Sequence, residues 1–321
     1  MEANSCLIIF EKAMNKRFEE MALVNGLKVF KADLQNNFSG NLFINILKRF
    51  ASKKSILLKV NDIKSFIELN KIERIYFSSS EGYISHNIIH QLKKQVKDIE
   101  FIALQHGVFP LKYSKIKEFA RNVINTFGKL FFQIYPLGAG FGGIKLNAYY
   151  VYSEREREFL VQNKKWSENK VKPKLDFIKA ELLHKRRNNE LNQDSNTALF
   201  LMQCLHLAGL TSLEEEKRLI EKTINYLAKK YKKVLIKTHP ACNEQTLNLK
   251  LSSNVELVND MIEGFGQSKN AYSFFSTALI DAKIFNLTTT GIFSDTINID
   301  KEIYENFDLK IDFEDIITNK I

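Results

Sequence analysis

The sequence predicts an α/β protein made of two sheet-containing halves, and three observations carry this prediction. Short apolar runs suited to buried strands alternate with amphipathic, helix-like segments, which is the pattern of parallel sheets covered by helices. The length of 321 residues suits two domains of roughly 150 residues each. Residues 184–196 are polar, as expected near a domain boundary. We therefore predict an N-terminal domain over residues 1–180 and a C-terminal domain over residues 181–321.

The composition is that of an ordinary soluble globular protein with an excess of positive charge. Hydrophobic residues make up 45% of the chain and charged residues 26%, which argues against disorder as its main property. The formal net charge of +10 favours acidic partners, whether nucleic acid, an anionic membrane surface or a negatively charged substrate. Charge alone does not choose among these three.

Cysteine usage and hydropathy indicate where the protein acts. The three cysteines show no metal-binding spacing, so we expect reduced thiols in the cytoplasm and no structural zinc. The apolar run at residues 7–10 is too short for a secretory signal. No apolar run approaches the roughly 18 residues needed to span a bilayer. We expect any contact with a membrane to be made from its surface.

The strands of the N-terminal half are predicted from short runs of large apolar residues, and its helices from apolar residues spaced three or four apart. Asn61 or Asp62 is expected to cap the helix that begins there. Residues 148–152 are expected to form the last strand of this half. The predicted strands are 7–10, 27–30, 55–60, 75–77, 101–104 and 148–152, and the predicted helices are 40–52, 62–70, 84–96 and 154–163.

The C-terminal half begins with the strongest buried strand of the chain, at residues 198–202. The long helix predicted after it has an acidic first turn and a basic last turn, which suits the helix dipole. We expect residues 284–293 to provide the last core strand. The predicted strands are 198–202, 234–236, 255–258 and 284–293, and the predicted helices are 212–230 and 278–282.

Polar residues follow two predicted strands of the N-terminal half. Ser80-Glu81-Gly82 comes after the strand at 75–77, where a carboxylate faces the crevice over the sheet and can serve as a general base. The alternative is that Ser80 or Glu81 only caps the next helix. His106-Gly107 follows the strand at 101–104, where glycine lets a ligand approach the backbone. That histidine is either a second candidate base or a hydrogen-bonded turn residue.

Residues 111–147 interrupt the alternation of strands and helices. Their first part is rich in lysine, arginine and aromatic residues, and their last part contains four glycines within six residues. A basic, aromatic helix can lie on an anionic bilayer surface. The alternative is a solvated helix followed by a flexible loop. The glycines do not follow the order of a phosphate-binding fingerprint.

In the C-terminal half, two polar clusters indicate an anion-binding site. Lys237-Thr238-His239-Pro240 ends the strand at 234–236 and places an imidazole at the rim of the sheet. Ser276-Thr277 precedes a predicted helix, where hydroxyls and free backbone amides favour phosphate. Together these groups suit a phosphate that is neutralised without a divalent ion.

Other catalytic patterns are absent from the sequence. It contains no P-loop, no Gly-x-Ser-x-Gly elbow, no His-Glu-x-x-His motif and no set of kinase motifs. His86 and His90 share a helix face four residues apart, but the sequence offers no third metal ligand near them. We therefore expect no metal site.

The order of these motifs resembles the bacterial sialyltransferases and polysialyltransferases. That group has an acidic-acidic-Gly motif where this chain has Ser80-Glu81-Gly82, so Ser80 replaces one acidic residue. It also has a His-Pro motif, matched by His239-Pro240, and a Ser-Ser/Thr motif, matched by Ser276-Thr277. The resemblance rests on the combination and covers most of the chain.

The resemblance implies a GT-B fold of two Rossmann-like domains with a cleft between them. It implies inverting, metal-independent transfer of sialic acid or a related acidic sugar from a CMP donor, with no further cofactor. Glu81 would be the general base. His239 would contact the donor phosphate and stabilise or protonate the leaving CMP, and Ser276 and Thr277 would hold the phosphate or the sugar carboxylate. Lys237 and Pro240 would belong to the same donor-binding stretch.

It also implies a role in surface-polysaccharide assembly, such as capsule or lipopolysaccharide biosynthesis. The expected partners are a CMP-activated acidic sugar, a glycan or glycolipid acceptor and the anionic cytoplasmic face of the inner membrane, but not nucleic acid. The expected location is therefore the cytoplasm, with peripheral contact to that membrane.

Two other functions stay open at this point. The His106-Gly107 turn and residues 152–156 resemble a wider group that includes capsule Kdo transferases and CDP-glycerol or CDP-ribitol phosphotransferases. In the phosphotransferases His106 would be the natural base. A basic nucleic-acid-binding or membrane-surface protein without catalysis would also explain the charge, although no nucleic-acid recognition motif is present.

Overall fold

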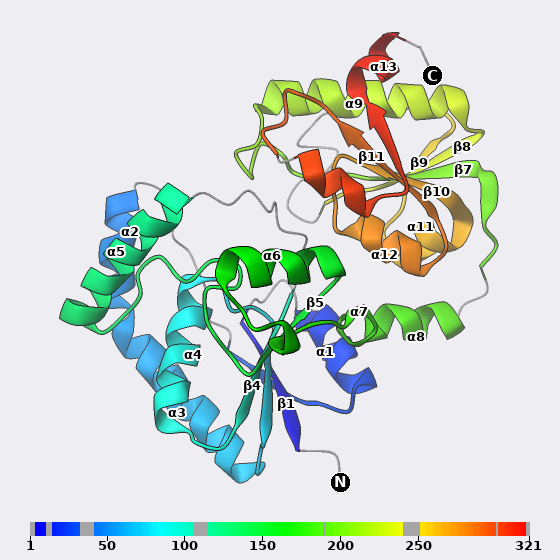
Figure 1. Ribbon diagram of the computed structural model, residues 1–321. Helices are drawn as coiled ribbons and strands as arrows, with labels where there is room; N and C mark the ends of the chain where they lie inside the picture. The colour runs from blue at the N-terminus through cyan, green and yellow to red at the C-terminus, as the bar shows by residue number, and fades with distance from the viewer. Residues whose placement is uncertain are drawn as a thin grey trace. The chain divides into compact units, whose positions relative to one another are not determined.

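The computed structural model shows two compact α/β units, each built around a six-stranded parallel sheet (Figure 1). Unit 1 extends to Glu181, and unit 2 takes up the chain from Leu182. Among the helices that the structure describes, none combines the length and the apolar composition needed to cross a membrane. The described residues are 4–10, 15–32, 42–105, 115–188, 191–239, 251–299 and 301–318.

The sheet of unit 1 has the strand order β2-β1-β3-β4-β5-β6, and all its pairings are parallel. The chain enters at β1, adds β2 on one side and then crosses to β3 on the other. The strand order therefore reverses between β1 and β3, which is where ligands bind in open α/β sheets. The strands are β1 (Ser5–Ile9), β2 (Lys28–Lys31), β3 (Arg74–Phe77), β4 (Glu100–Leu104), β5 (Ala148–Val151) and β6 (Val171–Pro173).

Helices cover both faces of this sheet because neighbouring strand residues point to opposite sides. On β3, Ile75 and Phe77 pack in one core cluster with α3, α4 and α6, while Tyr76 packs in another with α1. Phe177 of α7 stacks on Tyr76 at 4.9 Å. The helices are α1 (Asn15–Val24), α2 (Leu42–Ala51), α3 (Lys53–Leu69), α4 (Tyr83–Gln95), α5 (Lys115–Phe132), α6 (Glu154–Lys164) and α7 (Leu175–Ile178). Helix α8 (Ala180–Asn188) begins at the end of unit 1 and continues into unit 2.

The prediction of a strand at residues 55–60 was wrong, because this segment lies inside α3. Its apolar residues belong to a longer helical pattern in which Ile56, Val60, Ile63 and Ile67 are buried on one face. A short apolar run has no periodicity of its own that separates a strand from a buried helix. The helix expected at residues 62–70 is the second half of the same α3.

A further expectation at the end of unit 1 was also wrong. The strand at 148–152 is not the last of this half, because β6 pairs with β5 beyond it. The polar segment at 184–196 contains the end of α8 at Asn188 and the start of β7 at Asp194. β6 was not predicted from the sequence, because it has three residues and only Val171 is buried.

The sheet of unit 2 has the strand order β12-β11-β10-β7-β8-β9, again with parallel pairings. The chain enters at β7, and the strand order reverses between β7 and β10. The strand expected at 284–293 begins only at Thr288, and it is not the last strand, because β12 follows it. The strands are β7 (Asp194–Leu201), β8 (Lys233–Lys237), β9 (Val255–Leu257), β10 (Ser268–Ser273), β11 (Thr288–Phe293) and β12 (Leu309–Asp312).

Helices cover both faces of the second sheet as well. One core cluster joins the strands to α9 and α13, and another joins them to α11, α12 and the 3-10 helix η3. The prediction of an α/β fold with two sheet-based halves is therefore confirmed. The helices are α9 (Leu213–Lys230), α11 (Met261–Gln267), α12 (Ala278–Ile284), η3 (Lys301–Asn306) and α13 (Phe313–Thr318).

Candidate active site

In unit 1, the turn that carries Glu81 lies at the point where the strand order reverses. Ser78, Ser79 and Ser80 follow β3 and are buried, and Glu81 is half-buried. The backbone amide of Phe10, directly after β1, donates a hydrogen bond to Ser78 Oγ at 3.2 Å. This bond joins the carboxyl ends of β1 and β3, so the turn occupies the position at which open α/β sheets bind ligands.

The carboxylate of Glu81 accepts hydrogen bonds on both of its oxygens. Ser79 Oγ and the Ser80 amide donate to Oε2, each at 3.0 Å, and Ser80 Oγ donates to Oε1 at 3.1 Å. The hydroxyl of Tyr149, a fully buried residue of β5, also donates to Oε1. Burial, together with the neighbouring Glu81 carboxylate, raises the pKa of Tyr149 well above its usual value. Tyr149 therefore acts as a permanent donor to the carboxylate.

A glycine-containing loop holds the backbone of the same turn. The amides of Ala139 and Gly140 donate to the Glu81 carbonyl at 3.0 and 3.2 Å. Gly138 has φ +66°, and a Cβ at this position would lie 2.5 Å from the Glu81 carbonyl oxygen. Asn125 of α5 fixes the loop by donating to the Gly138 carbonyl at 2.7 Å. The glycine cluster seen in the sequence thus allows the loop to approach the Glu81 turn closely.

Capping does not account for the Ser80-Glu81-Gly82 motif, because Gly82 itself occupies the N-cap of α4. The sequence offered no signal for the roles of Tyr149 and Asn125, which lie far along the chain from Glu81. Their contacts appear only when β5 and α5 are packed. His106 and Gly107, the second candidate base and its neighbour, lie outside the described residues.

In unit 2, the predicted donor-binding residues follow neighbouring strands. β8 pairs with β7 in a register that places Lys237 beside Leu201, and the Met202 amide donates to the Lys237 carbonyl at 3.0 Å. His239 lies exposed two residues beyond β8. Partial desolvation and the Lys237 ammonium lower the pKa of His239, while Glu216 opposes this shift. Lys237 Nζ donates to the Thr238 carbonyl at 2.9 Å. Pro240 lies outside the described residues.

The serine cluster after β10 is tied to the end of β7. Ser273 Oγ donates to the Leu201 carbonyl at 2.7 Å and to Gln203 Oε1 at 3.1 Å. The Phe275 amide donates to the same Gln203 oxygen at 2.9 Å. Gln203 therefore bridges the two strands between which the order reverses. Sequence reasoning missed this residue, since a single glutamine in a loop carries no motif.

Ser276 and Thr277 lie at the start of α12. The Ala278 amide donates to Ser276 Oγ at 3.2 Å, and Thr277 occupies the N-cap without a capping bond from its own side chain. Since β8, β7 and β10 are adjacent and parallel, His239, Gln203 and Ser276 share one edge of the sheet. The structure thus brings the predicted donor-side residues His239, Lys237, Ser276 and Thr277 to the same edge.

A buried carboxylate supports the loop between β7 and α9. Glu216 is fully buried and accepts the Leu205 and His206 amides at 2.8 and 2.9 Å. Its Oε2 also lies within hydrogen-bonding distance of His206 Nδ1. These bonds fix the loop beside Gln203 and give α9 a stable position at this edge of the sheet.

The pair His86 and His90 lies in a pocket of about 610 Å³ in unit 1. Lys93, Lys94 and Lys145 also line this pocket. His86 stacks on Tyr135 at a ring distance of 4.2 Å, and desolvation lowers the pKa of each histidine to about 4. Within the described ranges, no group of three or more potential metal ligands is present.

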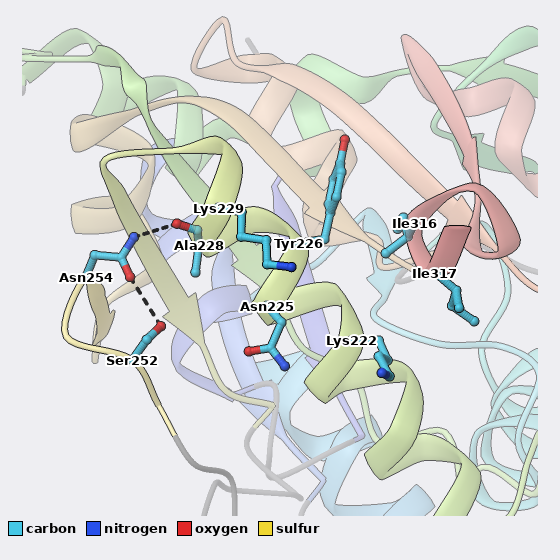
Figure 2. Close-up of a pocket in the computed structure, with 9 residues that line it drawn as sticks. All are labelled: Lys222, Asn225, Tyr226, Ala228, Lys229, Ser252, Asn254, Ile316 and Ile317. Carbon is cyan, nitrogen blue, oxygen red and sulfur yellow. Dashed lines mark hydrogen bonds between the residues drawn. The ribbon is translucent and has the colours of Figure 1, made fainter. Parts of the chain in front are cut away.

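A second pocket, of about 490 Å³, lies in unit 2 (Figure 2). It is lined by the C-terminal part of α9, by α13 and by Ser252 and Asn254, whose side chains are hydrogen-bonded at 3.2 Å. This part of α9 leads directly into the start of β8. The pocket therefore lies near the amino ends of the strands and contains none of the predicted site residues.

Comparison with known proteins identifies a family and a fold. A family model described as alpha-2,8-polysialyltransferase (POLYST) matches residues 1–293. None of the curated proteins compared with the chain matches it. The S. aureus MnaA–UDP co-structure matches with a TM-score of 0.55 at 9% identity, covering 99% of this chain and 87% of that one.

Two glycosyltransferase structures show the same architecture. The calicheamicin glycosyltransferase CalG4 matches with a TM-score of 0.52 at 10% identity, covering 91% of this chain and 80% of that one. SnogD from Streptomyces nogalater matches with a TM-score of 0.51 at 10% identity, covering 98% and 88%. At such identities the likeness concerns the fold, and the expected GT-B fold of two Rossmann-like domains is confirmed.

Proposed function

Since the chain belongs to the alpha-2,8-polysialyltransferase family, we propose that it transfers sialic acid or a related acidic sugar from a CMP donor to a glycan acceptor. It is a sialyltransferase-like glycosyltransferase with a GT-B fold. The transfer inverts the configuration at the anomeric carbon of the donor sugar.

One observation carries the proposal: in each unit, the polar motif lies where the strand order reverses. Ser80-Glu81-Gly82 follows β3 beside β1, and Ser276-Thr277 follows β10 beside β7. Ligands of open α/β sheets bind at this position. Each Rossmann-like unit therefore has one of the two motifs at the position where a bound substrate is expected.

On the donor side, we assign the CMP phosphate to His239, Lys237 and the start of α12. A neutral imidazole donates a hydrogen bond, and an ammonium supplies positive charge, so both stabilise the charge that develops on departing CMP. Ser276 and Thr277 add hydroxyl groups and nearby amides. This set offsets the phosphate charge with the chain's own groups, which supports transfer without a divalent ion.

On the acceptor side, we assign Glu81 as the general base. The acceptor oxygen attacks the anomeric carbon of the donor sugar, and its proton passes to the Glu81 carboxylate. The bond from the anomeric carbon to the CMP phosphate oxygen breaks, and its electron pair stays on the phosphate. Because Glu81 already accepts bonds from Ser79, Ser80 and Tyr149, the acceptor hydroxyl would replace one of the serine hydroxyls.

The setting that we propose is surface-polysaccharide assembly, either of capsule or of lipopolysaccharide, at the cytoplasmic side of the inner membrane. The formal net charge of +10 suits both an acidic glycan acceptor and an anionic membrane surface. Besides the glycan acceptor, a CMP-activated sugar is the only small-molecule partner that the reaction needs.

A CDP-glycerol or CDP-ribitol phosphotransferase is the second candidate. It is favoured by the sequence His106-Gly107, for which a turn is predicted and in which His106 would be the base. The two reactions differ at the atom attacked, which is an anomeric carbon in one and phosphorus in the other. Donor choice therefore separates them.

The test compares the donors directly and then the two assigned groups. We expect the purified chain with a sialylated oligosaccharide acceptor to release CMP from CMP-sialic acid but not from CDP-glycerol or CDP-ribitol. Glu81→Gln should lower transfer by about 10²–10⁴-fold, because the base is lost. His239→Ala should lower it by about 10²-fold, because one stabilising donor is lost.

Matched variants control for the substitutions themselves. Glu68→Gln changes an exposed carboxylate of α3, and His184→Ala changes a histidine of α8, and both should keep full transfer activity. Circular dichroism should give the same folded spectrum for all four variants. Turnover of a CDP-polyol would favour the second candidate, and full activity of Glu81→Gln would remove Glu81 from the mechanism.

A further inference from the structure

Helix α5 exposes an apolar face along its whole length. Six large apolar residues of this helix are more than half exposed, including Ile116 at 82%, Phe119 at 70% and Leu130 at 72%. At about 100° per residue, the six fall within an arc of about 120° on one side of the helix. The six residues are Ile116, Phe119, Val123, Phe127, Leu130 and Phe131.

The opposite side of α5 is the one that packs against unit 1, and it is polar or small. Asn125 is buried and bonded to the loop at Gly138, as described above. Gly128 lies against Pro136 so closely that a Cβ there would be 2.5 Å from the proline ring. Glu118 pairs with Lys164 at 2.8 Å. A surface helix ordinarily turns its apolar side inward, so α5 has the reverse arrangement.

Positive charge accompanies this apolar face. Helix α5 contains four basic residues and one acidic residue, and that acidic residue is the paired Glu118. Lys115 near the start and Lys129 near the end are exposed. Helix α2 lies beside the end of α5, where Phe50 contacts Phe132 at a ring distance of 4.1 Å (Figure 1). Lys53 bonds to Gln133 at 3.1 Å and adds a further cation there.

We propose that the apolar face of α5 docks on an anionic phospholipid surface, with its phenylalanines in the interfacial region and its lysines against the headgroups. Apolar residues on one side and cations beside them are what a helix lying in a bilayer interface needs. A second copy of the chain fits less well, because pairing two α5 faces would bring cations of the same sign together. The docking is independent of the transfer reaction.

Vesicle flotation without donor or acceptor tests the proposal. The purified chain should float with vesicles of phosphatidylcholine mixed with phosphatidylglycerol, and it should bind far less to phosphatidylcholine alone. Combining Ile116→Ser with Phe119→Ser should lower the partition coefficient at least about tenfold, since two apolar side chains no longer enter the interface. Combining Lys115→Gln with Lys129→Gln should weaken binding and its dependence on salt.

The matched control replaces exposed leucines elsewhere in unit 1. Leu23 and Leu69 are 80% and 84% exposed, and the double variant Leu23→Ser, Leu69→Ser should bind vesicles like the unchanged chain. Equal binding by the Ile116, Phe119 variant would overturn the proposal. So would absence of flotation, or a dimer in light scattering that this variant dissociates. CMP release with a water-soluble acceptor is measured separately, so failure of docking is distinguished from failure of the proposed transfer.

Discussion

Glu81 illustrates how a candidate base can be held in place by its own turn. Its carboxylate accepts bonds from two serine hydroxyls, one amide and the buried Tyr149 hydroxyl. These bonds orient the carboxylate. A carboxylate that acts as base must also have a lone pair directed at the acceptor. Serine hydroxyls rotate freely, so they are the donors that an incoming acceptor hydroxyl can replace.

His86 allows a prediction about pH. Desolvation lowers its pKa from 6.5 to about 4 in the folded chain. The unfolded chain therefore binds more protons between these two values, and the free energy of unfolding falls as the pH drops through this window. Between about pH 7 and pH 5, the unchanged chain should lose on the order of 1 kcal/mol more stability than His86→Gln. Urea unfolding followed by circular dichroism at both pH values measures this difference.

The pKa of the neighbouring His90 is lowered as well, first by desolvation and then by the positive charges of Lys94, Lys129 and Lys93. The matched control is His184→Gln, which changes a histidine of α8. Its pH dependence of stability should equal that of the unchanged chain. Equal slopes for His86→Gln and the unchanged chain would show that His86 titrates normally.

At the scale of elements, the loop at residues 138–140 connects α5 to the Glu81 turn. Two of its amides bond to the Glu81 carbonyl, and Asn125 anchors the loop to the helix. The position of the candidate base therefore depends on backbone contacts from a segment more than fifty residues away. In unit 2, side chains likewise hold the loops that carry the predicted donor-binding residues. Glu216 accepts an amide of the loop after β7, and Gln203 accepts an amide of the loop after β10.

Two glycines with the same left-handed backbone conformation allow the cost of backbone strain to be measured separately from the cost of a steric contact. Gly26 and Gly138 both have φ +66°, but a Cβ at Gly26 would meet nothing within 4 Å, whereas at Gly138 it would meet the Glu81 backbone. Gly26→Ala should cost about 1–2 kcal/mol for the left-handed conformation alone. Gly138→Ala should cost clearly more and should lower transfer as well, because it displaces the Glu81 turn. Thermal unfolding and the CMP-release assay measure the two effects.

Gly26→Ala is the control, because Gly26 lies outside the Glu81 turn and its substitution should leave transfer unchanged. If the two substitutions destabilised the chain equally, the loop would have room to move away from Glu81. The close contact would then not determine the position of the turn.

At the scale of the whole molecule, each unit has its own parallel sheet and its own core clusters. A nucleotide that binds unit 2 should stabilise the folded chain, because a ligand of the folded state raises the free energy of unfolding. At 100 times its dissociation constant, CMP should add about 2.7 kcal/mol. We expect CMP to raise the melting temperature by several degrees, and UDP and GDP to have little effect.

His239→Ala should reduce this shift, while His184→Ala should preserve it. An equal shift with all nucleotides would contradict the CMP-specific site. Salt-sensitive binding to RNA or DNA without any response to CMP would instead support the non-catalytic reading of the basic charge.

Much of the fold could be predicted because parallel strands buried on both faces are almost continuously apolar. The central strands β1, β3, β4, β7 and β8 were all predicted for this reason. The edge strands β6 and β12 were not predicted, because they are short and partly polar. The central strand β10 was also missed, because Lys269 and Asn270 interrupt its buried residues. The segment at 55–60 shows the limit of local pattern, because its apolar run belongs to helix α3.

The sequence by itself determined the α/β class and placed His239, Ser276 and Glu81 directly after strands, because hydropathy and turn chemistry are local properties of the chain. Only the tertiary structure decided the order of the strands, and with it the two positions where that order reverses. It also decided that Tyr149 and the 138–140 loop hold Glu81, that Gln203 joins β7 to β10 and that α5 turns its apolar face outward. The reason is physical: contacts between residues distant in the chain form only when the sheets and helices are packed together.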